Sequence, residues 1–172
     1  MKISTMHVYQ NARHWALGLI LLTALFSSHA HADSALRDLQ GNITTFSDQQ
    51  VPGKWTVVMI WASDCHVCNA ESGQYSGFHQ AHSATDATVL GISIDGKERL
   101  EDAREFVDRN GVVYPNLIGD LDTVAQWYHM ETGEDFIATP TFVVFGPEGE
   151  VRAAQPGAVP PSAIEEFISG KS

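Results

Sequence analysis

Continuous apolar runs alternate with segments of helical spacing along most of the chain. Residues 55–61 and 88–94 are apolar and rich in β-branched and aromatic residues, which is typical of strands buried on both faces of a sheet. Residues 64–82 and 97–110 repeat apolar positions at helical spacing, so both predict helices. Asp64 is the predicted N-cap of the first helix, because its side-chain oxygen can accept a backbone N–H.

Shorter elements complete the predicted fold at both ends. Residues 34–50 predict a β-hairpin, and residues 141–154 predict a second hairpin around a glycine-containing turn. A short helix is predicted at 121–128, and a closing helix begins at a Pro-Pro pair and runs over 160–168. This alternation predicts an α/β fold with a central mixed β-sheet flanked by helices and an added N-terminal β-hairpin.

Residues 1–32 have the three parts of a signal peptide. A basic start is followed by an apolar centre, and residues 30–32 form the small-x-small pattern that signal peptidase accepts. We therefore predict cleavage before Asp33 and a periplasmic domain over residues 33–172. The alternative is an uncleaved N-terminal anchor.

The formal net charge of −11 narrows the range of partners. Without the two basic residues of the signal peptide, eight Lys and Arg oppose 21 Asp and Glu. A surface this acidic repels phosphate backbones, and the basic clusters that bind nucleic acid are missing. We therefore expect no nucleic-acid partner, whereas basic protein partners remain compatible with the charge.

The chain has two cysteines, Cys65 and Cys68, at the junction between the first buried strand and the following helix. A disulfide that closes so small a loop removes little unfolded-state entropy, so chemistry explains the pair better than stapling does. A helix N-terminus stabilises a thiolate at Cys65 through its free amides and dipole. One turn later, Cys68 can attack a mixed disulfide at Cys65. Cys65 is the predicted nucleophile and Cys68 the resolving thiol.

Half a zinc site has the same spacing as this cysteine pair. Such a site usually needs four ligands, and the chain has no second CxxC. His79 and His82 lie on one predicted helix face, but three or more turns from the cysteines, so we interpret them as solvated. We expect neither a metal nor a cofactor, with a copper or zinc carrier that uses the cysteines and His66 as the alternative.

The motif Trp61-Ala-x-x-Cys65-x-x-Cys68, followed by Glu71, resembles the active site of the TlpA/ResA branch of the thioredoxin superfamily. Further matches follow in order at residues 91–95, 114–117, 139–142 and 146–149. The resemblance runs from about Leu36 to Ser169. It implies a thioredoxin-like fold and an exported thiol–disulfide oxidoreductase.

The same resemblance implies roles for particular residues. Pro140 would be cis and face the cysteines, leaving the backbone of Thr139 free to bind a substrate as an added strand. Glu71 would assist proton movement at the cysteine pair; the alternative is an ordinary surface glutamate. The substrate-binding residues implied by the resemblance or by their position in the motif are Trp61, His66, Val67, Thr139 and Pro140.

In this branch the usual task is to keep an exported partner reduced, such as apocytochrome c or a copper-site protein, with a membrane electron donor behind it. The chain departs from the pattern at three places, of which the dipeptide between the cysteines leaves the direction open between reductant and oxidant. The cysteines enclose His66-Val67 without a proline, and Asp64 replaces an aromatic residue. The third is a segment from Tyr128 to Pro140 that is longer than in typical relatives. Its acids are Glu131, Glu134 and Asp135.

A peroxidase is the nearest different reaction. The active site of peroxiredoxins has a PxxxTxxC motif. In this chain, the proline and threonine positions of that motif are occupied by Val58 and Ala62. The sequence therefore favours thiol–disulfide exchange over peroxide reduction.

Overall fold

The computed structural model describes residues 36–170. The predicted signal peptide over residues 1–32, with its cleavage site before Asp33, lies outside these residues. No helix within the described part is both long and apolar enough to cross a membrane.

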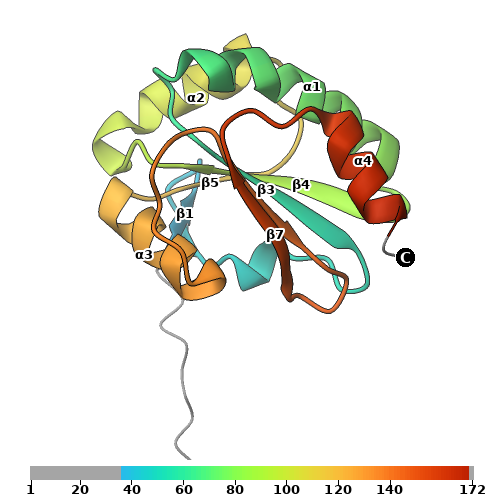
Figure 1. Ribbon diagram of the computed structural model, residues 1–172. Coiled ribbons are helices and arrows are strands. Elements are labelled where there is room, and N and C mark those ends of the chain that lie inside the picture. The colour runs from blue at the N-terminus through green and yellow to red at the C-terminus, as the bar shows by residue number, and fades with distance from the viewer. Residues whose placement is uncertain (1–35, 171–172) are drawn as a thin grey trace, which may run out of the picture. The chain divides into compact units, whose positions relative to one another are not determined.

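A seven-stranded mixed sheet forms the centre of the described domain, with the strand order β2-β1-β5-β4-β3-β6-β7 (Figure 1). The strands are β1 (Leu36–Asp38), β2 (Ile43–Thr44), β3 (Trp55–Trp61), β4 (Ala87–Ser93), β5 (Asn116–Ile118), β6 (Thr141–Phe145) and β7 (Val151–Pro156). The α-helices are α1 (His66–His82), α2 (Leu100–Arg109), α3 (Leu121–Thr132) and α4 (Pro161–Ser169). Two 3₁₀ turns are η1 (Ser47–Gln49) and η2 (Lys97–Arg99).

The strands β3 and β4 are buried along their whole length, as their apolar sequences predict. They run parallel, with Val57 opposite Val89, and β5 continues the parallel part of the sheet. On the other side of β3, the strand β6 pairs antiparallel. The predicted mixed sheet is confirmed, and β3, the strand that leads to the cysteines, lies in its interior.

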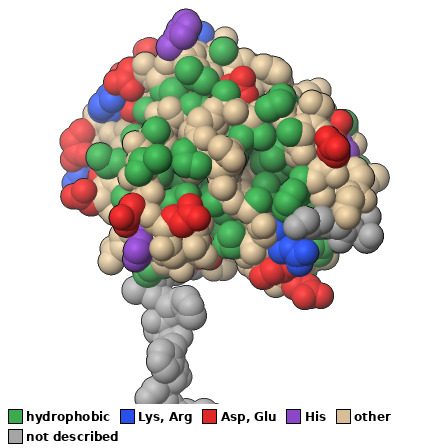
Figure 2. Space-filling view, viewed as in Figure 1, with side chains coloured by type: hydrophobic (Ala, Val, Ile, Leu, Met, Phe, Trp, Pro, Cys, Tyr) green, Lys and Arg blue, Asp and Glu red, His purple; other side chains and the backbone are tan. Residues whose placement is uncertain are grey.

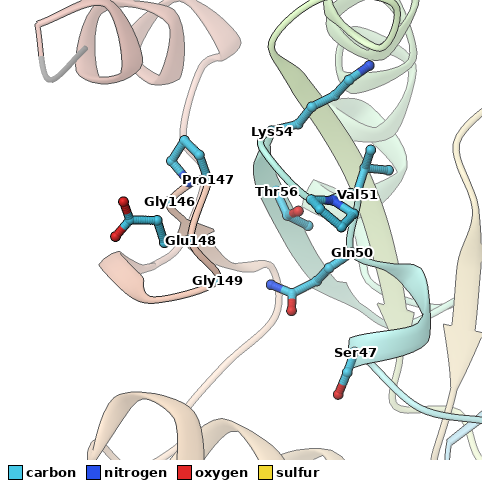
Figure 3. A pocket seen from close by; sticks show the side chains of 10 residues that line it. Ser47, Gln50, Val51, Lys54, Thr56, Gly146, Pro147, Glu148 and Gly149 are labelled. Carbon is cyan, nitrogen blue, oxygen red and sulfur yellow. The ribbon is translucent and has the colours of Figure 1, made fainter.

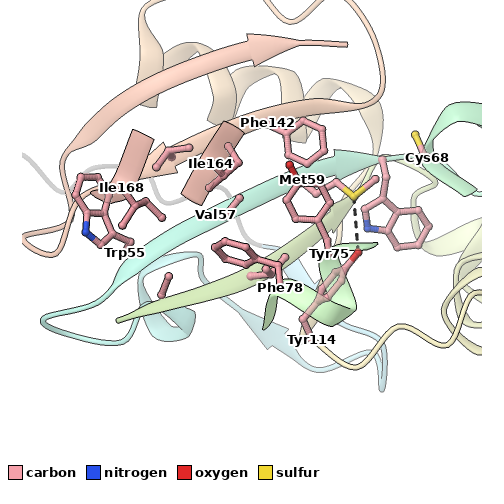
Figure 4. Packing of buried hydrophobic residues seen from close by; sticks show 14 of the residues in the cluster. Trp55, Val57, Met59, Cys68, Tyr75, Phe78, Tyr114, Phe142, Ile164 and Ile168 are labelled. Carbon is pink, nitrogen blue, oxygen red and sulfur yellow. Dashed lines mark hydrogen bonds between the residues drawn. The ribbon is translucent and has the colours of Figure 1, made fainter. Parts of the chain in front are cut away.

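Helices cover both faces of the sheet. The side chains of Val57 and Met59 point to the face that α1, α2 and α4 cover (Figure 4). Val58 and Ile60 point to the opposite face, where α3 packs together with Phe46. Alternate residues of β3 thus belong to two separate hydrophobic clusters, as expected for a strand with buried faces on both sides.

Several short elements differ from the sequence-based expectation. The N-terminal hairpin is confirmed, with Gly41 at φ +91° in its turn, but its second strand ends at Thr44 and η1 occupies the end of the range expected for the hairpin. The strand β5 was not predicted. The helix expected at 97–110 begins as the 3₁₀ turn η2, and α3 continues past Tyr128 to Thr132. Part of the long segment before Pro140 is therefore helix.

Candidate active site

The two cysteines form a disulfide at the junction of β3 and α1. Cys65 is the N-cap of α1, and its Sγ accepts the backbone N–H of Cys68 at 3.1 Å. Cys65 is partly exposed, whereas Cys68 is fully buried against the core (Figure 4). A partner molecule can therefore reach the sulfur of Cys65 first.

The prediction that Asp64 caps this helix is wrong. The backbone of Cys65 has the extended conformation of an N-cap residue, so its own sulfur takes the free amide. The carboxylate of Asp64 is exposed instead and lies 3.3 Å from the Nη1 of Arg99. No acid occupies the first turn of α1, so the helix N-terminus keeps its positive potential at the sulfur of Cys65.

The residues predicted to bind a partner near the disulfide differ in exposure: Pro140 is buried and Thr139 is only partly exposed. His66 and Val67, between the cysteines, are both exposed. The peptide bond between Thr139 and Pro140 is cis, as the resemblance implies, and β6 begins directly after it. Because Thr141, the first residue of β6, pairs with Ile60 near the end of β3, this loop ends on the side of the sheet at which β3 leads to the cysteines.

The hydroxyl of Thr141 stabilises the cis-proline loop by donating a hydrogen bond to the carbonyl of Ala138 at 2.7 Å. Before this loop lies the acidic segment, in which Glu134 accepts a hydrogen bond from the Tyr128 hydroxyl. Asp135 is exposed and lies 3.4 Å from the imidazole of His129. The acidic residues thus lie on the chain segment that leads directly to Pro140.

Glu71 lies one turn beyond Cys68 on α1 and is partly buried. Its Oε2 atom is buried and has no hydrogen-bond partner, and burial raises the pKa of the carboxyl group. One turn later, Tyr75 donates to the carbonyl of Val159 at 2.7 Å. Burial, followed by the charge of Glu71, raises the pKa of Tyr75. A carboxyl group in this environment holds its proton to higher pH than an exposed one does.

The side chain of Trp61, which we predicted to bind substrate, does not reach the surface. Its side chain is fully buried and stacks on Phe106 at 4.0 Å between ring centroids. The indole N–H donates to Oδ1 of Asn116 at 3.0 Å, a contact that leaves no room for a side chain at Gly91. Trp61 supports the core beneath the cysteines instead.

We expected His79 and His82 of α1 to be solvated, but both make specific contacts. Nδ1 of His79 accepts the backbone N–H of Val89 at 3.0 Å, and burial lowers the pKa of this imidazole. His82 stacks on Phe78 and lies 3.0 Å from a carboxylate oxygen of Asp86. Among residues 36–170, no three or more His, Cys, Asp or Glu residues cluster as metal ligands do.

The sequence analysis missed a polar network around Ser63, two residues before Cys65. Asp95, two residues after β4, accepts the backbone N–H and the hydroxyl of Ser63, and Arg99 also contacts both residues. A signal was available, because the carboxyl ends of adjacent parallel strands meet at one sheet edge. A carboxylate directly after β4 was therefore a candidate neighbour of the loop after β3.

A cavity of about 210 Å³ lies away from this chemistry (Figure 3). It lies between the segment that precedes β3, which includes Lys54, and the turn from Gly146 to Gly149. Because the cysteines follow the other end of β3, this cavity is not part of the redox site. On the face that Figure 2 shows, hydrophobic side chains occupy the centre and acidic side chains are spread around the margin.

Comparison with known proteins identifies a family and several relatives. Residues 28–154 match the AhpC/TSA family. The sporulation thiol-disulfide oxidoreductase A of Bacillus subtilis is 22% identical over 116 residues, covering 67% of each chain. The thiol-disulfide oxidoreductase ResA of Oceanobacillus iheyensis is 21% identical, covering 73% of this chain and 62% of that protein. Alkyl hydroperoxide reductase C of Mycobacterium tuberculosis is 38% identical over only 55 residues, 31% of this chain and 28% of that protein.

Solved structures share the fold. A DsbF homologue from Corynebacterium diphtheriae superposes with a TM-score of 0.65 at 22% identity, covering 79% of this chain and 84% of that one. A secreted disulfide oxidoreductase of Mycobacterium tuberculosis, described as homologous to Escherichia coli DsbE, gives 0.61 at 20% identity, covering 79% and 94%. The predicted thioredoxin-like fold, with extra strands β1 and β2, is confirmed.

Proposed function

Since the chain belongs to the AhpC/TSA family and is a thiol–disulfide oxidoreductase, we propose that it reduces disulfides of exported partner proteins in the periplasm. One observation carries this proposal: a partly exposed Cys65 at the N-terminus of α1 is bonded to a fully buried Cys68. Such a pair has an attacking sulfur that partners can reach and a resolving sulfur that they cannot reach directly.

The reaction begins from the reduced pair. The Cys65 thiolate attacks one sulfur of a partner disulfide, and the other partner sulfur leaves as a thiolate and takes up a proton. The Cys68 thiolate then attacks the sulfur of Cys65, and the second partner sulfur leaves. Two electrons have passed to the partner, and the Cys65–Cys68 disulfide remains. A membrane electron donor returns two electrons and reopens this disulfide.

Glu71 assists the second step by accepting the proton of the Cys68 thiol. Residues three positions apart on a helix lie on the same face, which supports a position of the carboxyl group near this thiol. Its raised pKa makes it a better base for a thiol than an ordinary glutamate is. The fully buried Cys68 has little access to water as an alternative proton acceptor.

The partner binds as an extended segment along the cis-proline loop. The backbone of Thr139 offers the hydrogen bonds of an added strand, and the exposed Val67 contacts the side chains near the partner's cysteine, while the buried cis Pro140 sets the course of the loop. Apocytochrome c and copper-site cysteine pairs are the partner types that the TlpA/ResA resemblance implies. The acids Glu131, Glu134 and Asp135 favour partners with basic residues near the disulfide.

Trapping tests both the partner and the order of attack. In cells that express Cys68→Ala, mixed disulfides at Cys65 should accumulate and identify the partner by mass spectrometry. Cys65→Ala is the matched control and should capture nothing. The direction is tested separately by the equilibrium potential of the purified pair against glutathione. A potential close to that of the strongly oxidising DsbA, about −120 mV, would overturn reduction and favour a disulfide-donating oxidase.

The local similarity to alkyl hydroperoxide reductase C raises peroxide reduction as a second activity. The positions of the proline and threonine in the peroxidatic motif are the apolar residues Val58 and Ala62, both buried. Peroxide therefore lacks the threonine hydroxyl beside Cys65, and we expect no significant peroxide turnover. Peroxide consumption that persists in Cys68→Ala would contradict this expectation.

A further inference from the structure

The turn between β3 and α1 is held by a buried carboxylate from the neighbouring strand. Oδ2 of Asp95 accepts the backbone N–H of Ser63 at 2.9 Å, and Oδ1 accepts the Ser63 hydroxyl at 3.0 Å. The hydroxyl of Ser93 donates to Oδ2 at 2.7 Å. Nη1 of Arg99 lies 3.1 Å from Oδ1 and compensates the charge of a side chain that is 0% exposed. Each oxygen of Asp95 therefore has two partners.

The other side of the same turn is held from α1 and α2. The side-chain amide of Asn69 donates to the carbonyl of Ser63 at 3.3 Å and to the carbonyl of Cys65 at 2.8 Å. Its own oxygen accepts from Arg109 at 2.9 Å and from Asn110 at 3.0 Å. Ser63 is consequently fixed through its N–H, its hydroxyl and its carbonyl, two residues before the reactive sulfur.

We propose that Asp95 is a positioning residue for thiol–disulfide exchange, which fixes the Ser63 turn so that the sulfur of Cys65 stays at the N-terminus of α1. Asp95 acts through Ser63 and does not touch the sulfur or the partner. The inference rests on the exchange activity of the pair, but not on its direction or on the identity of the partner.

The sign of the effect separates positioning from simple electrostatics. A negative charge near a thiolate disfavours that thiolate, so removal of the Asp95 charge alone would make Cys65 more acidic and faster to react. Loss of the fixed turn has the opposite effect, because the sulfur leaves the free amides that stabilise its anion. A slower reaction of Cys65 in the variant therefore indicates that Asp95 acts by fixing the turn and not by its charge.

The test measures alkylation of reduced Cys65 by iodoacetamide as a function of pH, with peptide mapping to assign the modified cysteine. In Asp95→Ala we expect the midpoint of the profile to rise. The rate at pH 7 should fall about tenfold, as when a thiol pKa near 7 returns toward about 8.5. Ser63→Ala keeps the backbone N–H but loses the hydroxyl contacts, so its profile should shift in the same direction by a smaller amount.

Asp38→Ala is the matched control. The carboxylate of Asp38 holds another turn through the backbone N–H groups of Gln40 and Asn42, at the far side of the sheet from β3. This variant should be less stable and yet have a wild-type alkylation profile. If Asp95→Ala does not fold, the alkylation profile of Ser63→Ala tests the proposal instead. A folded variant of either kind with a wild-type or faster Cys65 overturns the proposal.

The outcome also separates this inference from the proposed function. A wild-type Cys65 that titrates near 8.5 contradicts the thiolate on which the exchange mechanism depends. An acidic wild-type Cys65 whose profile is the same in Asp95→Ala leaves that mechanism intact and refutes only the positioning role.

Discussion

Replacement of Glu71 by glutamine should stabilise the protein and slow its reaction. The Oε2 atom of Glu71 is buried without a hydrogen-bond partner, and a buried unsatisfied acceptor costs about 1–3 kcal/mol, or more when it is charged. Glutamine keeps the size of the side chain but removes the charge. Because the side chain is only partly buried, we expect the lower end of this range, a gain of about 1 kcal/mol at pH 7.

The gain should depend on pH with a defined sign. Burial raises the pKa of Glu71 in the folded protein above the ordinary value of 4.5. The wild-type carboxyl group therefore contributes its full share of stability below pH 4.5, and that share is lost as the pH rises through the folded pKa. Glutamine does not titrate, so its advantage over the wild type should appear above pH 4.5 and vanish at pH 4.

Urea unfolding of the oxidised protein at pH 4 and pH 7 gives the free energies for this comparison. Release of a reduced model substrate from a mixed disulfide, followed by stopped flow, gives the effect on the second step, which should slow by about 100-fold or more. Glu166→Gln, at an exposed position of α4, is the control and should change neither quantity. An equal gain at both pH values, or unchanged release, would refute the role of Glu71.

Two further predictions concern the support of the site. Gly91→Ala should destabilise the protein by about 3 kcal/mol, because the new methyl group would overlap Oδ1 of Asn116 and break its hydrogen bond to Trp61. Urea unfolding measures this loss, and an unchanged unfolding midpoint would contradict the close packing at Gly91. Burial lowers the pKa of His79 below 6.5, so the neutral ring contributes stability above pH 6.5 that is lost as the pH falls through the folded pKa. Thermal unfolding between pH 5 and 8 should show this loss in the wild type and a smaller one in His79→Gln, which keeps an acceptor for Val89.

The features that the sequence predicted correctly depend on long patterns or specific motifs. The apolar runs that became β3 and β4 are seven residues each, which is long enough for composition and flanking turns to identify buried strands. The cysteine pair and the Thr139-Pro140 step were found through motif order, since a cis bond has a prior of only about 5%. Each of these signals is contained in one segment of the chain.

The features that escaped prediction depend on contacts between distant segments. The strand β5 has three residues, and only its pairing with β1 and β4 distinguishes it from a loop. Asp64 and Cys65 are adjacent, and only the backbone conformation of Cys65 shows that the helix begins one residue later than predicted. The bond between Ser63 and Asp95 joins residues 32 positions apart, and no local pattern encodes such a contact.

The side chains of Asp95, Asn116 and Glu71 differ in how far their polar atoms are satisfied. Asp95 has two partners for each carboxylate oxygen, and Asn116 both accepts from Trp61 and donates to the carbonyl of Tyr114. Glu71 alone of the three has an orphaned buried oxygen. Satisfied groups hold geometry, whereas a carboxylate with too few partners is a stronger base, because nothing compensates its charge. The same deficit that costs stability would suit Glu71 to the proposed transfer of a proton from Cys68.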